Sequence, residues 1–326
     1  MHAIDGKPYG WHHTTGYREG AELYRRLYNR NDTVLRYRAD MAQAVASLGL
    51  CLRLEQKYAD GEACFREALA HFEDLVARNR EQPELKVDLA KTRYDYGVLL
   101  RETGRLDEAR GQYDQAIRIQ EALIEKYDHK RYKLDLAISR QGLGIACERG
   151  RDDATANTLF TRAIDEMDRL LALASHDQDF LWSAWMNRYA RGVLRWRAGD
   201  RDGAAADFAC PMAGDTHVWR LLFLRAFRGD PAVVADAERL AAAPTGDAAI
   251  DAAAVIAMSG TFPGLPAAER DRRHTLAAGL LKTAERHFTS KKVRVDFLTR
   301  RELDPLRDHP EYQRLRQVAE QLDRKK

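Results

Sequence analysis

Cysteine and long apolar runs are both scarce in this 326-residue chain. The four cysteines, Cys51, Cys64, Cys147 and Cys210, show no CxxC spacing of the kind that zinc or redox sites use. Cys51 and Cys64 could approach each other across a helix hairpin, but reduced, buried thiols are the favoured interpretation. No stretch approaches the roughly 20 apolar residues of a membrane span, and the N-terminus has no signal-peptide core. We therefore expect a cytoplasmic protein without a membrane partner.

A large excess of charge of one sign is also missing. The chain has 53 Lys and Arg against 50 Asp and Glu, which gives a formal net charge of +3. Hydrophobic residues make up 45% and charged residues 32%, which is typical of a globular protein. Because nucleic-acid binding normally needs a basic surplus, we expect no nucleic-acid partner.

Signatures of catalysis and of cofactor binding are not found either. The sequence has no GxxxxGK[ST] phosphate loop, no GxGxxG, no GxSxG and no HExxH. Two sets of possible metal ligands occur: His12 and His13 with Asp5, and Cys51 and Cys64 with His71. The first offers only two ring nitrogens, and the second fits no zinc spacing. We expect no enzyme, no cofactor and no metal.

What the chain does have is a motif that recurs four times. Its anchors are Gly49, Gly97, Gly144 and Gly192, at steps of 48, 47 and 48 residues. A small residue follows each anchor after twelve positions, and an aromatic follows four positions later: Gly61 and Phe65, Ala109 and Tyr113, Ala156 and Phe160, Ala204 and Phe208. Repetition at this period predicts a helical solenoid with one helix pair in each repeat.

Turn residues separate the two predicted helices of a repeat. Gly104 and Gly199 lie where a first helix would stop, and the aspartate after each lies where the next helix would be capped. In the fourth copy Pro211 replaces a small residue, so we expect its second helix to end early. The strict repeat is lost beyond this proline.

These residues resemble the tetratricopeptide repeat. The likeness is carried by Leu48-Gly-x-x-Leu52 with Gly61-x-x-x-Phe65-x-x-Ala68 and by the matching positions of the next copies. A tetratricopeptide repeat has 34 residues, so a period of 47 or 48 implies about seven extra residues on each helix. The extra length repeats too, because Asp40, Asp88 and Asp135 all lie nine residues before their glycine. This long-helix form, and the closing Leu303-Asp-Pro-Leu-Arg307, resemble bacterial arrays linked to eukaryotic-type serine/threonine kinases.

The resemblance implies an all-α fold, a right-handed superhelical solenoid of antiparallel helix pairs with a C-terminal helical cap. We expect an N-terminal segment with an incomplete repeat at 1–36, four long repeats at 37–211 and a degenerate helical cap at 212–326. Helical patterns within the cap cover 217–228, 231–243, 247–258, 267–288 and 310–322.

In this family the first helices line a concave groove in which a partner peptide lies. The groove positions carried over by register are Gln43, Ala46, Leu50, Arg53, Lys91, Tyr94, Val98, Arg101, Ile138, Gln141, Ile145, Arg149, Met186, Tyr189, Val193 and Arg197. The candidate peptide-binding residues among them are Arg53, Lys91, Tyr94, Arg101, Gln141, Arg149, Tyr189 and Arg197. They would suit a partner of acidic character, with apolar anchors and one or two carboxylates. Ordinary solvated helix surface is the alternative interpretation.

Two functions follow as hypotheses. The first is a non-catalytic interaction scaffold that binds a protein or peptide, and the alternative is the regulatory half of a kinase signalling protein. Four tryptophans, Trp182, Trp185, Trp196 and Trp219, lie close in sequence to Arg188, Arg191, Arg195 and Arg197. They could stack on bases or hold an acidic peptide, but filling the joint between array and cap is the favoured interpretation. The oligomeric state is not predicted.

Overall fold

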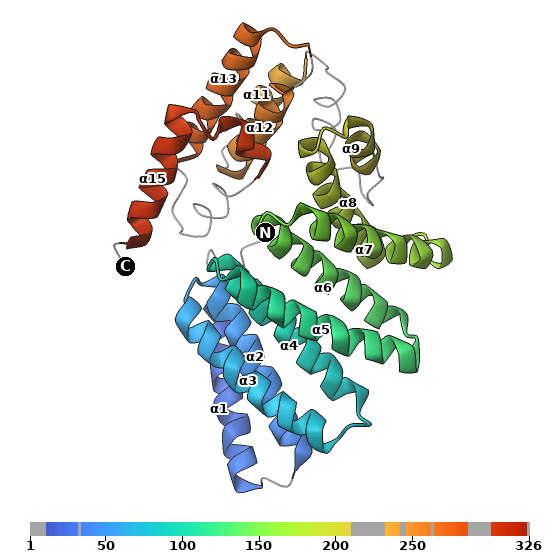
Figure 1. Ribbon diagram of the computed structural model, residues 1–326. Coiled ribbons are helices and arrows are strands. Elements are labelled where there is room, and N and C mark those ends of the chain that lie inside the picture. The colour runs from blue at the N-terminus through green and yellow to red at the C-terminus, as the bar shows by residue number, and fades with distance from the viewer. Residues whose placement is uncertain are drawn as a thin grey trace. The chain divides into compact units, whose positions relative to one another are not determined.

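The computed structural model describes residues 11–31, 34–209, 232–241, 246–261, 264–285 and 301–324. Within these residues every regular element is a helix, as predicted (Figure 1). The chain divides into two compact units, Met1–Asn187 and Arg188–Lys326. The domain boundaries predicted at 36 and 211 stay a prediction. None of the described helices is long and apolar enough to cross a membrane.

The first unit is a succession of long helices. They are α1 Trp11–Arg30, α2 Leu35–Leu54, α3 Tyr58–Arg78, α4 Pro83–Glu102, α5 Leu106–Tyr127, α6 Lys130–Arg149, α7 Asp153–Leu173 and α8 Gln178–Arg197, which runs past Asn187 into the second unit. From α1 to α7 each helix packs against the next one along the chain. The first helices also pack on one another, α2 on α4 and α4 on α6. Helices α2 to α7 have 20 to 22 residues, the extra length that the repeat period predicts.

The anchor glycines are needed because an aromatic ring of the second helix lies directly on the backbone of the first. A Cβ at Gly144 would lie 2.5 Å from Cε1 of Phe160, and a Cβ at Gly97 would lie 2.8 Å from Cε1 of Tyr113. Tyr113 is held from both sides, since a Cβ at Gly142 of α6 would lie 2.7 Å from the same atom. The recurring glycine and aromatic therefore mark the place where the two helices of a repeat approach most closely.

The turn predictions hold at the glycines and fail at one cap. Helices α4 and α8 end two residues before Gly104 and Gly199, whose φ angles are +82° and +85°. Asp200 caps α9, because its Oδ1 accepts from the backbone N–H of Gly203 at 2.9 Å. The predicted cap at Asp107 is wrong. Helix α5 starts at Leu106, two residues earlier than a cap at Asp107 requires, so its N-cap is Arg105 and Asp107 lies in the first turn.

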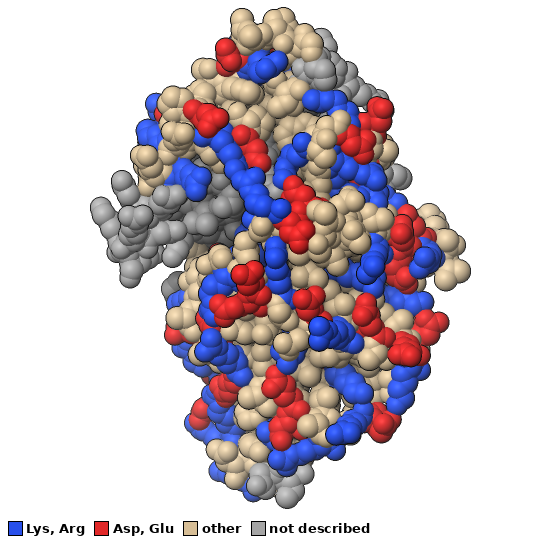
Figure 2. All heavy atoms as spheres, in the orientation of Figure 1, with Lys and Arg blue, Asp and Glu red and all other residues tan. Residues whose placement is uncertain are grey.

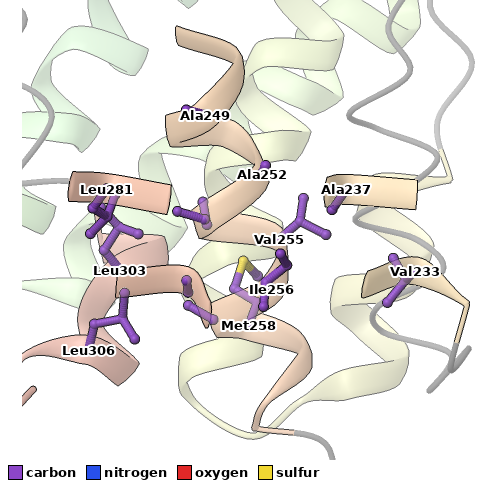
Figure 3. Packing of buried hydrophobic residues seen from close by; sticks show 14 of the residues in the cluster. Val233, Ala237, Ala249, Ala252, Val255, Ile256, Met258, Leu281, Leu303 and Leu306 are labelled. Carbon is purple, nitrogen blue, oxygen red and sulfur yellow. The ribbon is translucent and has the colours of Figure 1, made fainter. Parts of the chain in front are cut away.

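The second unit contains shorter helices. They are α9 Arg201–Phe208, α11 Val233–Ala241, α12 Gly246–Ser259, α13 Ala267–Glu285, the 3-10 helix η1 Arg301–Leu306, and α15 Pro310–Arg324. Helix α9 ends before Pro211, as predicted. Helices α11, α12, α13 and α15 fall within a few residues of their predicted ranges, and the helix predicted at 217–228 lies outside the described residues. The core is built around α12, which contacts α11, α13 and η1 (Figure 3).

Candidate functional site

Two adjoining pockets open between the first helices of the repeats in the first unit. The larger, which we call the acidic pocket, has a volume of about 350 Å³ and is lined by α4, α5 and α6. The smaller, which we call the side pocket, has about 240 Å³ and is lined by α4, α6 and the part of α8 that belongs to the first unit. Tyr94, Arg131 and Ile138 line both. The pocket pair is therefore one site built from successive repeats.

Helical periodicity explains how these side chains reach the site. Asp88, Lys91 and Asp95 are spaced by three and four residues and so lie on one face of α4. Asp135 lies 47 residues after Asp88, which gives it the same place on the neighbouring helix α6. Tyr94 is supported from behind by Tyr113, with ring centroids 5.7 Å apart. The repeat thus places equivalent positions of α4 and α6 around the acidic pocket.

Three of the eight candidate residues line the site. Lys91 and Tyr94 line the acidic pocket, and Tyr94 and Gln141 line the side pocket. The predicted groove positions Ile138 and Met186 are there as well. Register from the repeat glycine therefore points to the residues of this site on α4, α6 and α8.

The other five candidates lie elsewhere. Arg53 Nη1 forms an ion pair with Glu102 Oε1 at 2.6 Å, and both side chains are largely buried. Arg149 Nη1 donates to the backbone carbonyl of Arg101 at 3.4 Å. In the second unit, the ring of Tyr189 lies 5.7 Å from that of Phe208, and Arg197 lies 3.9 Å from Asp304. Binding roles for these five stay a prediction.

Carboxylates are the feature that the sequence interpretation missed. Asp88, Asp95 and Asp135 all line the acidic pocket. The signal for two of them was present, since Asp88 and Asp135 recur at one register, but it was interpreted only as a sign of longer helices. Asp95 has no such counterpart, because Gly142 lies 47 residues after it. Arg131 on α6 was also missed, although it lines both pockets.

Burial dominates the electrostatics of these carboxyl groups. Burial raises the pKa of Asp95 to about 6, although Lys91 and Arg53 act in the opposite direction. The pKa values of Asp88 and Asp135 are also raised by burial, against the attraction of nearby cations. Carboxyl groups that are desolvated without being fully compensated cost folding free energy and are typical of functional sites.

Several buried polar atoms that line the site have no hydrogen-bond partner within the described residues. In the acidic pocket they are Gln120 Oε1 and Ser139 Oγ, on side chains that are 5% and 1% exposed. In the side pocket they are Gln141 Nε2 and Ser183 Oγ. An unpaired buried polar group costs about 1–3 kcal/mol. The walls of both pockets therefore contain polar groups whose hydrogen-bonding capacity is not used within the described residues.

The metal and disulfide candidates can now be placed. Cys51 and Cys64 are half-buried free thiols, and burial raises the pKa of both. His71 Nδ1 accepts from Arg38 Nε at 3.2 Å. No group of three metal-ligating side chains occurs among the described residues. Asp5 lies outside those residues, and so do the side chains of His12 and His13.

Of the four tryptophans, Trp182 and Trp185 belong to the first unit and Trp196 to the second. In the first unit, Trp182 packs on Trp185 with ring centroids 5.5 Å apart, and Trp182 is 51% exposed and lines the side pocket. In the second unit, Trp196 is buried in the core and donates from Nε1 to Thr261 Oγ1 at 3.2 Å. Trp219 lies outside the described residues.

Three of the four arginines near these tryptophans, Arg191, Arg195 and Arg197, contact carboxylates. Arg191 holds Asp207 through both carboxylate oxygens, at 2.5 and 2.9 Å, and Arg195 contacts the same group at 3.0 Å. On the face drawn in Figure 2, basic and acidic side chains are interspersed and no field of one sign dominates.

Comparisons with known proteins support the fold. No protein-family model matches the chain, and no match is found among curated proteins. The apo form of RapI superimposes with a TM-score of 0.54 at 13% identity, over 95% of this chain and 93% of that chain. BtubC from P. vanneervenii gives a TM-score of 0.49 at 16% identity, over 87% of this chain and 95% of that chain. The likeness to RapI concerns the fold alone, and it agrees with the helical, solenoid-like packing of consecutive helices.

Proposed function

We propose that this protein is a non-catalytic interaction scaffold that binds an extended segment of a partner protein in the pocket pair. The observation that carries the proposal is that the predicted groove residues Lys91, Tyr94 and Gln141 line two adjoining pockets with unsatisfied polar atoms. Function has to be argued from such a site, since the fold itself hosts many activities.

The composition of the pocket pair fits a peptide. The acidic pocket has a volume at the lower end of the range for small-ligand sites, and the side pocket is smaller still. Each has room for a side chain of a peptide. Because the two pockets share Tyr94, Arg131 and Ile138, a segment crossing them would contact α4, α6 and α8 in turn. Contacts with successive repeats are what an extended chain can supply.

Site-specific photo-crosslinking tests this proposal. A photoreactive amino acid at Met186, in the side pocket, is expected to form covalent adducts with a protein in an extract of the native cells. The matched control carries the same group at Leu173 on α7, which is 87% exposed and does not line either pocket. Mass spectrometry of the adducts should identify a partner seen only from Met186. Identical adducts from both positions, or none from Met186, would contradict the groove assignment.

A link to a serine/threonine kinase remains the alternative. It rests on the recurring Asp88-Leu-Ala90 phrase and on the closing Leu303-Asp-Pro-Leu-Arg307, which resemble kinase-linked arrays. Sequencing the gene region tests it directly. A kinase domain in the same reading frame would support it, and an unrelated gene with its own ribosome-binding site would argue against it.

A further inference from the structure

The acidic pocket offers more hydrogen-bond acceptors than donors. Asp88, Asp95 and Asp135 only accept when ionised, and the unpartnered amide oxygen of Gln120 also accepts. Ser139 adds a buried hydroxyl that can accept as well. The charged donors in the lining are Lys91 and Arg131, whose side chains are exposed. A ligand that complements this lining must be rich in donors.

The two cations do not neutralise the three carboxylates. Arg131 lies 3.3 Å from Asp135, and it also lies 3.6 Å from Asp179 of the side pocket, so it is shared. Among the described residues, no ion pair within 4.0 Å joins Lys91 to a carboxylate. The lining therefore has an excess of negative charge. Because the carboxylates are partly buried, their attraction for a cationic ligand is stronger than it would be in water.

Aromatic side chains select among cationic groups. Tyr94 and Tyr132 line the acidic pocket together with the carboxylates. A guanidinium group carries five N–H donors and no acceptor, and its flat face stacks on aromatic rings. An ammonium group has three donors and does not stack in this way. We propose that the acidic pocket receives the guanidinium of an arginine in the partner segment, an inference that rests on the proposed function.

The side pocket extends the inference to a second position of the segment. Leu134, Met186 and Trp182 give it apolar walls beside the acidic pocket. An apolar side chain close to the arginine would fill it and remove this surface from water. The partner therefore differs from the acidic peptide that the sequence predicts, because the acidic groups lie on the scaffold and the cation lies on the partner.

Raised pKa values agree with such a ligand. Burial holds the pKa of Asp95 near 6 and raises those of Asp88 and Asp135. An entering cation favours the ionised carboxylates and lowers these pKa values again. A bound arginine would thus offset the cost of keeping these buried carboxylates ionised.

Selection of displayed peptides on the full-length chain tests the proposal. Random peptides that bind should be enriched in arginine beside an apolar residue. For one such synthetic peptide, exchanging the arginine for citrulline, which has the same shape without the charge, should weaken binding by about 30-fold or more. Lysine in its place should weaken binding by about 3- to 10-fold, since it lacks the planar group.

Variants of the chain supply the reciprocal measurement. Asp95→Asn and Asp135→Asn should each weaken binding of the arginine peptide by about 10-fold or more. The matched control Asp165→Asn, on the exposed face of α7, should change it less than about 2-fold. Thermal melting checks folding, and if Asp135→Asn unfolds the chain, Asp95→Asn still decides the question. With the citrulline peptide, Asp95→Asn should have little further effect, which a merely structural role for Asp95 would not produce.

The outcomes separate this inference from the proposed function. If Tyr94→Ala abolishes binding while citrulline and Asp95→Asn change nothing, the arginine assignment is wrong and the groove proposal stands. If the selected peptides bind Tyr94→Ala as tightly as the native chain, both are wrong. If spermidine alone competes at the concentration at which the peptide does, the pocket is a site for a small free cation, and the assignment to a partner segment is overturned.

Discussion

The two compact units bury their helices in opposite ways. In the repeats a second helix such as α5 buries one stripe, and the first helices α4 and α6, although buried over much of their C-terminal halves, keep a partly exposed face at Asp88, Lys91 and Asp135. In the second unit, every residue of α12 from Ala252 to Ser259 is buried, so this part of the helix is covered on all sides. Helices that are apolar all round form cores, whereas striped helices leave a free face. The difference explains why the pocket pair is found on the repeats.

The largest effect on the difference between the two units is expected from a charge placed inside α12. Ala253→Glu should abolish the fold of the second unit, because a buried, unpaired carboxylate costs more than about 4 kcal/mol. Ala253 is fully inaccessible, whereas Ala268 on α13 is exposed and Ala268→Glu serves as the control. Hydrogen exchange should show loss of protection in α12 and α13 while α4 to α6 stay protected. Loss of protection throughout the chain would mean that the first unit depends on the second.

A smaller effect is expected from closing the space above a repeat glycine. Gly144→Ala would place a Cβ 2.5 Å from Phe160, and relief of this clash should cost about 1–3 kcal/mol of unfolding free energy. Gly111 on α5 has no neighbouring atom within 4 Å of an added Cβ. There, alanine should stabilise by about 0.5–1 kcal/mol, because it lowers the entropy of the unfolded chain. Urea denaturation should therefore give opposite signs, and equal signs would rule out the close-contact explanation.

Asp95 sharpens the contrast, because its burial in a pocket should cost stability. The folded pKa of about 6 lies above the ordinary 3.8, so the folded chain binds more protons than the unfolded chain between these values. The contribution of Asp95 to the unfolding free energy therefore falls as the pH rises from about 4 to about 6. Asp95→Asn should stabilise by about 1–3 kcal/mol at about pH 7.5 and by little at about pH 4.

Urea denaturation at both pH values measures the effect of Asp95, with Asp165→Asn as the control. Destabilisation by Asp95→Asn at the higher pH would show that the carboxylate supports the fold. The charged groups that lower the pKa of Asp95 are Lys91 of α4 and Arg53 of α2, and Asp88, Arg131 and Asp135 line the same pocket.

The smallest effect concerns the turns between paired helices. Gln56, Gly104, Arg151 and Gly199 hold the same position in successive repeats, and all have positive φ angles. A non-glycine residue is strained there, so Arg151→Gly should raise the unfolding free energy by about 0.5–1 kcal/mol. The melting temperature should rise slightly as a result. Gly104→Ala should lower stability by a similar amount. If Arg151→Gly and Gly104→Ala change the stability in the same direction, backbone strain is not the property that these turns share.

The sequence was sufficient for the fold wherever a local pattern carries the information. The period of the glycines and aromatics predicted the helix pairs, since each pair repeats one contact, as between Gly144 and Phe160. Helix ends were predicted well at Gly104 and Gly199, where a positive φ angle favours glycine. The cap at Asp107 was wrong because the helix starts two residues earlier, which moves the aspartate into the first turn.

The candidate site was only partly predictable. Lys91, Tyr94 and Gln141, which register assigned to the groove, line the pocket pair, because helical geometry fixes which residues share a face; their binding roles stay a prediction. Charge pairing across helices is not encoded in any local pattern, so the partnership of Arg53 with Glu102, 49 residues away, could not be foreseen. The same holds for the burial that raises the pKa of Asp95.

The ring of Tyr113, held between Gly97 of α4 and Gly142 of α6, has a consequence for recognition. It locks two consecutive repeats together and supports Tyr94, a wall of both pockets. A wall that is already fixed loses little freedom when a ligand arrives. The affinity of a bound segment would then be limited by the ordering of the partner, and a pre-shaped or cyclic ligand should gain more here than on a flexible surface.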